Sequence, residues 1–223
     1  MFKELYQLWK QDNSLTQAIN DSYEMLTQTL EMFRESVKSL RESDDGELQI
    51  NVYEKDQVVN KYICDVRRKV LKYLAITGGM NIIPGLVLTS IVIDIERIGD
   101  YTKNITDLAL AHPRKLKGGD FEEDFQKIEQ AVTDIFEKLI TALRESDKTA
   151  AAQLINNQYW VLKRCDEIVT AFIKEENLAL SPRDAASRTL YARYLKRIAA
   201  HLMNIASSVV NPFEHIGFRS EGD

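Results

Sequence analysis

Two carboxylates on one helical face are the residues of this sequence best placed to do chemistry. Glu96 and Asp100 are four residues apart, so in a helix their side chains lie on the same face, one turn from each other. Like charges at this spacing destabilise an isolated helix by about 0.2–0.5 kcal/mol. A cation would relieve the repulsion, and hard cations prefer carboxylate oxygens. The pair therefore predicts a metal site; the competing interpretation is a solvated helix edge on which Arg97 or Lys103 balances the acids.

A second polar pair, Asp56 and Asn60, has the same spacing on the preceding predicted helix. Antiparallel neighbouring helices can bring such flanks together, so we expect Asp56, Asn60, Glu96 and Asp100 to form one oxygen-rich metal site. Ordinary surface polarity is the alternative. Gly99, between the two acids, costs a helix interior about 1 kcal/mol relative to Ala. Its presence predicts the close approach of another backbone or of a bound group.

The elements that must position these residues are long helices. Apolar residues recur at three- and four-residue steps along nearly the whole chain, which is the pattern of amphipathic helices. Only 4 Pro and 9 Gly occur in 223 residues, too few turn residues for a sandwich of short strands. Six helices are predicted, and breaks at 43–46, 78–79 and 112–119 separate the first four. Asp120 is the expected N-cap of the fourth helix, and Ser181-Pro182 begins the sixth.

The two halves of the chain share a short pattern. The residues x-R-I-x-x-x-x-x-N-I occur from Glu96 and again from Lys196, 100 residues later, in the last predicted helix of each half. We therefore predict an all-α fold made by internal duplication: two tandem antiparallel three-helix bundles, the first over 1–113 and the second over 118–212. The apolar start of the third helix, 82–93, predicts burial against the other bundle or against a dimer partner.

Composition limits the class of protein. With 29 basic and 34 acidic residues the net charge is −5, so we expect no binding to nucleic acid. The N-terminus does not resemble a signal peptide, and the most apolar run, 82–95, is shorter than the ~20 residues of a membrane span. Cys64 and Cys165 indicate buried thiols in a reducing compartment. We expect a cytoplasmic protein that is peripheral to a membrane at most.

The segment 94–105, in which Glu-Arg-Ile-Gly-Asp is followed by Asn104-Ile105, resembles the PhoU family of regulators of bacterial phosphate uptake. The six-helix organisation extends the resemblance from about Met1 to Pro212. The family's acidic motifs bind metals, so the resemblance implies metal binding by Glu96 and Asp100, with Asp56 and Asn60. Iron is the metal we expect, with zinc, manganese or magnesium as alternatives.

The second half departs from the family pattern. Lys196 and Ala200 stand where acids are expected; the first would repel a cation and the second cannot ligate one. Asp166 could be what remains of that site. We therefore predict a divergent member of the family, with a degenerate second repeat and at most one metal site, in the first half.

The resemblance implies a non-enzymatic regulator of phosphate homeostasis that acts as an adaptor. Its expected partners are the cytoplasmic ATPase subunit of a phosphate transporter and a membrane sensor kinase, and we expect a homodimer. Two alternatives stay open: an accessory helical module of a cation-coupled phosphate transporter, and an oxygen-ligated metalloenzyme such as a phosphohydrolase. The lack of a histidine near the acids in the sequence argues against the enzyme.

Overall fold

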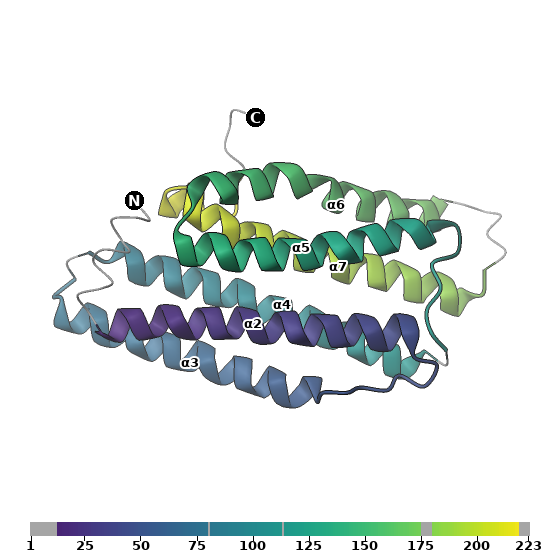
Figure 1. Ribbon diagram of the computed structural model, residues 1–223, viewed down its shortest axis with the longest axis horizontal. Helices are drawn as coiled ribbons and strands as arrows, with labels where there is room; N and C mark the ends of the chain where they lie inside the picture. Colours follow the sequence, from purple (N-terminus) through teal and green to yellow (C-terminus); the bar gives the residue numbers. More distant parts are fainter. Residues whose placement is uncertain (1–12, 80, 113, 175–179, 219–223) are drawn as a thin grey trace.

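Six long α-helices in two groups of three make up the fold (Figure 1). The computed structural model describes residues 13–79, 81–112, 114–174 and 180–218, and this part of the chain contains no β-strand. The helices are α2 (Asn13–Glu42), α3 (Val52–Ile76), α4 (Ile83–Ala111), α5 (Glu122–Glu145), α6 (Lys148–Lys174) and α7 (Pro182–Val210). The predicted all-α fold of two tandem three-helix bundles is confirmed.

Local sequence explains where several helices begin. The Asn51 side chain accepts hydrogen bonds from the first backbone N–H groups of α3, at 3.1 and 3.2 Å, and Ser181 caps α7 in the same way at 3.1 Å. The prediction that Asp120 caps the fourth helix is wrong, because a 3₁₀ turn, Gly119–Phe121, precedes α5. Three acids at 122–124 instead place negative charge in the first turn of α5, where the helix dipole favours it.

Helix α4 is the element that joins the two bundles. It packs against α2 and α3 of its own bundle and against α7 of the other. Its apolar start is buried only in part: Val87 and Leu88 are 1% and 2% exposed, but Ile82 and Ile93 are 44% and 43% exposed. Asp94 meets His201 and Tyr101 meets Arg197, so residue numbers fall on α7 as they rise on α4. The last helices of the two bundles therefore cross in antiparallel order along the centre of the molecule.

The duplication is visible in burial as well as in sequence. Residues 91–100 of α4 and 191–200 of α7 follow the same order of buried, half-buried and exposed positions. An offset of 100 residues thus relates equivalent positions of the two helices, as the shared pattern indicated. The repeat limits 1–113 and 118–212 stay a prediction, and residues 1–12 lie outside the described part of the chain.

Two further expectations concern the cysteines and the membrane. Cys165 is fully buried, but Cys64 is exposed on α3, so the prediction of two buried thiols is wrong for Cys64. Of the helices the structure describes, none combines the length and the apolar character that crossing a bilayer requires.

Candidate functional site

The four predicted metal ligands come together where α3 packs against α4. The two helices approach closely at Gly85, where an added Cβ would lie 2.9 Å from the Val70 side chain. Farther along the pair, buried Asp56 faces α4 and accepts a hydrogen bond from Asn60 at 3.3 Å. We call Asp56, Asn60, Glu96 and Asp100, the last two half-buried on α4, the acidic cluster. That these four residues bind a metal stays a prediction.

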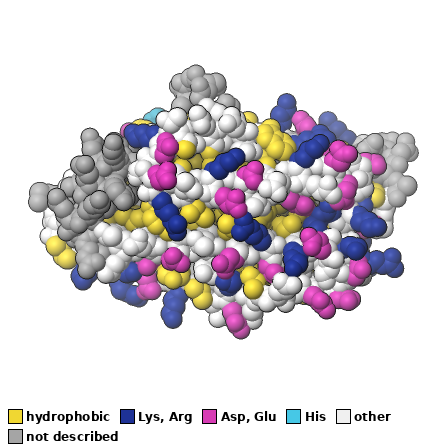
Figure 2. Space-filling view, viewed as in Figure 1, with side chains coloured by type: hydrophobic (Ala, Val, Ile, Leu, Met, Phe, Trp, Pro, Cys, Tyr) yellow, Lys and Arg dark blue, Asp and Glu magenta, His cyan; other side chains and the backbone are white. Residues whose placement is uncertain are grey.

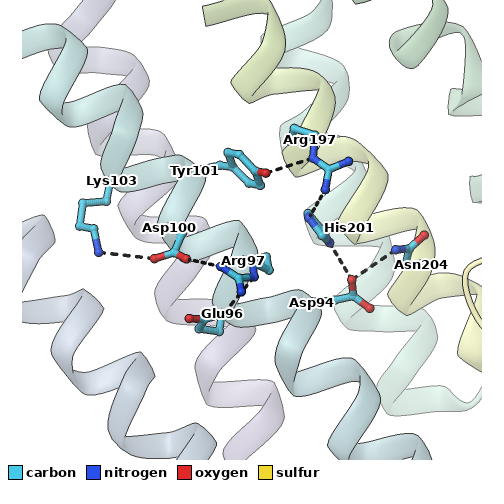
Figure 3. A network of polar contacts seen from close by, with 9 residues as sticks. All are labelled: Asp94, Glu96, Arg97, Asp100, Tyr101, Lys103, Arg197, His201 and Asn204. Carbon is cyan, nitrogen blue, oxygen red and sulfur yellow. Dashed lines mark hydrogen bonds and ion pairs between the residues drawn. The ribbon is translucent and has the colours of Figure 1, made fainter. Parts of the chain in front are cut away.

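Two basic side chains lie within the acidic cluster. Lys103 Nζ is 2.9 Å from Asp56 Oδ2 and 3.5 Å from Asp100 Oδ1, so one ammonium group bridges the two helices. Arg97 reaches Asp100 at 3.1 Å and Glu96 at 3.6 Å, and Figure 3 shows Arg97 and Lys103 on either side of Asp100. These contacts are the internal balance of charge that the competing interpretation of a solvated edge anticipated.

The charges of the cluster shift two pKa values. Burial, followed by the negative charges of Asp100 and Asp56, raises the pKa of Glu96 above its ordinary value. Burial alone would lower the pKa of Lys103, but its hydrogen bond to Asp56 and the charges of Asp56 and Asp100 raise it. Arg97 and Arg67 lower the pKa of Glu96, but they do not offset burial and the two neighbouring acids.

The oxygen donors of the acidic cluster are of the kind that a hard cation prefers, but their side chains are not arranged around a common metal position. Three carboxylates and one amide oxygen are the donors that iron, manganese and magnesium accept. In the part of the chain that the structure describes, no three His, Cys, Asp or Glu side chains are arranged to hold a metal ion. The Lys103 ammonium lies between Asp56 and Asp100. A metal that uses both carboxylates would therefore have to displace Lys103.

Gly99 does not have the role that its place between the acids predicted. An added Cβ would lie 3.7 Å from Thr29, 3.8 Å from Asp56 and 3.9 Å from Val59, which are ordinary van der Waals distances. The close approach expected at Gly99 is therefore absent, and the structure leaves room for an alanine. The equivalent residue of α7 is Ala199.

The equivalent flank of the second bundle is held by ion pairs. Lys196, 100 residues after Glu96, pairs with Asp166 of α6, and Arg193 approaches the same carboxylate at 3.5 Å. Ala200 is the residue of the second repeat that corresponds to Asp100, and its side chain has no oxygen that could bind a metal. Asp166 is thus the ion-pair partner of two cationic side chains, and the expectation of at most one metal site, in the first half, stays a prediction.

A polar network that the sequence argument missed lies on the other side of α4 (Figure 3). His201 Nδ1 is 2.7 Å from Asp94 Oδ1, and Asn204 donates to the same oxygen at 3.3 Å. The His201 ring stacks on Tyr101, and Arg197 donates to the Tyr101 hydroxyl at 3.1 Å. These contacts cross the boundary between the bundles. In the sequence, the one indication of this network was Asp94, an acid at the end of an apolar run.

Geometry and fold together define a protein of two three-helix repeats, with an acidic cluster on one repeat and a polar network that connects it to the other. The model of the PhoU domain matches residues 23–109 and again 125–209. The chain belongs to the PhoU family.

The solved structures similar to this chain include two PhoU proteins. The phosphate transport system regulatory protein PhoU from Streptococcus pneumoniae has 17% identity and a TM-score of 0.75, with 87% of this chain and 92% of that chain covered. PhoU from Pseudomonas aeruginosa has 20% identity and a TM-score of 0.71, with 88% and 95% covered. No curated protein matches the chain.

Proposed function

We propose that the chain is a non-enzymatic regulator of phosphate uptake that acts as an adaptor in the cytoplasm. The observation that carries the proposal is the family match, which covers both repeats. The similar structure from S. pneumoniae is titled a phosphate transport system regulatory protein, and that role is the one proposed for this chain. Its partners would be a phosphate transporter's cytoplasmic subunit, a sensor kinase, or both, bound to a homodimer.

We further propose that the acidic cluster binds one hard metal ion, with iron first and manganese, magnesium or zinc as alternatives. Asp56, Glu96 and Asp100 would supply carboxylate oxygens and Asn60 an amide oxygen. The bound ion would supply positive charge between α3 and α4 and so fix the packing of the two helices. The raised pKa of Glu96, caused first by its burial and then by the charges of Asp100 and Asp56, supports the proposal, because a cation relieves that repulsion.

The regulatory role can be tested by measuring phosphate uptake in cells that lack the gene for this chain. In phosphate-rich medium we expect uptake to rise when the chain is absent and to return to normal when the wild-type chain is supplied. Glu96→Ala/Asp100→Ala should fail to restore normal uptake. Asp120→Ala/Glu123→Ala removes the same charge from exposed acids of the second half and should restore it. Unchanged uptake after deletion would refute the role.

A further inference from the structure

The end of the α3–α4 hairpin combines a basic stretch of α3 with an uncharged stretch of sequence. The chain carries a net charge of −5, yet residues 61–72 contain five basic residues and one acidic residue. Residues 73–93, which run around the turn into α4, contain no charged residue. A basic stretch is thus followed by an uncharged end.

Exposed aliphatic side chains lie at this end. Leu71 is 68% exposed, Ile76 is 65% exposed, and Ile82, on the other side of the turn, is 44% exposed. Lys61, Arg68, Leu71 and Lys72 are all exposed on α3, and their spacing places them along the outward side of the helix. Figure 2 shows Lys and Arg side chains along the lower left edge, over the C-terminal part of α3, with hydrophobic side chains beyond them.

We propose that the end of the α3–α4 hairpin binds an anionic phospholipid surface. Leu71, Ile76 and Ile82 would enter the interfacial region of the bilayer, and Lys61, Arg67, Arg68 and Lys72 would lie against the headgroups. A group of basic residues beside exposed apolar side chains is the combination by which proteins attach to the face of a membrane. Among the described residues of this tip, the large exposed apolar side chains are aliphatic and Tyr73 is buried, whereas aromatic residues dominate protein-binding hot spots.

The charges of the neighbouring elements leave most of this basic group available. On α2, Asp21 pairs with Lys69, and within α3 Asp65 pairs with Arg68. The first acid of α4 after the turn is Asp94. Lys61 and Lys72 remain exposed beyond these pairs; Arg67 is also exposed, but its charge acts on Glu96 of α4. Membrane attachment here would direct the second bundle away from the lipid, where a partner could reach it.

The chain contains its own probe for this surface. Cys64 is exposed on α3, one turn before Arg68 and two turns before Leu71, whereas Cys165 is fully buried. Burial, with the neighbouring charge of Asp166, raises the pKa of Cys165 to about 12, which makes it a poor nucleophile near neutral pH. An environment-sensitive fluorophore can therefore be attached to Cys64 alone.

Vesicle binding by the full chain, labelled at Cys64, tests the proposal. Phosphatidylglycerol-containing vesicles should sediment the chain and shift the Cys64 emission, phosphatidylcholine vesicles should do so much more weakly, and added salt should reverse binding. Lys61→Gln/Lys72→Gln should weaken partition about thirtyfold. Leu71→Ser/Ile76→Ser should weaken it about tenfold or more.

Matched changes at the opposite end of the molecule serve as the control. Lys163→Gln/Lys174→Gln and Ile173→Ser alter exposed residues of α6, whose end lies far from the α3–α4 turn, and should leave partition unchanged (Figure 1). Unchanged thermal unfolding would show that every variant folds. Failure to bind anionic vesicles at low salt, equal loss in the controls, or a Cys64 signal with poly-glutamate but not with vesicles would overturn the proposal; the last result would assign the surface to an acidic protein segment.

Discussion

Replacement of Lys103 by Met tests whether an internal cation holds the place that a metal would take. The change keeps an unbranched side chain but removes the ammonium group that contacts Asp56 at 2.9 Å and Asp100 at 3.5 Å. The side chain of Asp56 is 10% exposed and that of Lys103 is 27% exposed, so solvent replaces the lost contacts only in part. Hydrogen bonds to charged groups contribute about 1.5–3 kcal/mol, and we expect Lys103→Met to lower the unfolding free energy by about 2 kcal/mol without metal.

The same variant should bind metal more tightly. A unit positive charge about 4 Å from a divalent ion costs about 2 kcal/mol even in a water-like dielectric, so its removal should strengthen binding about thirtyfold. Metal should therefore stabilise Lys103→Met more than it stabilises the wild type.

Thermal unfolding in chelator and calorimetric titration with Mn²⁺ and Fe²⁺ measure the two effects. In a chain of this length, a loss of about 2 kcal/mol lowers Tm by about 4–8 °C. Lys127→Met, which removes a side chain that is 65% exposed, is the control and should change stability by less than about 0.5 kcal/mol. A Lys103→Met variant as stable as the wild type, with equal or weaker metal affinity, would refute the reasoning.

Three further substitutions probe the same region by urea unfolding. Gly99→Ala should stabilise the chain by up to about 1 kcal/mol, since the added Cβ makes only ordinary contacts; destabilisation would show that the site is tighter than described. Glu96→Gln should stabilise the metal-free chain by about 0.2–0.5 kcal/mol at pH 7. Because burial and the nearby acids raise the pKa of Glu96 in the folded state, ionised Glu96 costs stability as pH rises through that pKa, and the gain should vanish below pH 4. A gain that persists at low pH would contradict this origin. Asp94→Ala removes contacts from His201 and Asn204 and should cost about 2 kcal/mol; an unchanged midpoint would deny the network a role in joining the bundles.

The acidic cluster was predictable because its geometry is local. Glu96 and Asp100 share a face through helix periodicity, and Asp56 and Asn60 belong to the helix that directly precedes theirs, so a hairpin suffices to bring the pairs together. The place of Lys103 was not predictable in the same way. Whether Lys103 contacts Asp56 depends on how both helices are rotated about their axes. The apolar pattern predicts that rotation with an uncertainty of about one residue position.

The same uncertainty explains the error at Cys64. Ile63 and Val66, close to Cys64 in the sequence, are buried. If the buried face of α3 were shifted by one residue position, it would include the Cys64 thiol. The network of Asp94 and His201 had a different obstacle, because these residues are 107 positions apart. Their pairing requires the antiparallel crossing of α4 and α7, a long-range feature that periodicity does not contain.

The metal content of the purified chain tests the central claim most directly. In protein prepared without chelators, elemental analysis should find one bound metal ion per chain. Glu96→Ala/Asp100→Ala should contain none, while Asp120→Ala/Glu123→Ala, with the same change of charge, should match the wild type. Equal and negligible metal in all three proteins would contradict the account and leave the acidic cluster as a solvated helix edge held by Lys103 and Arg97.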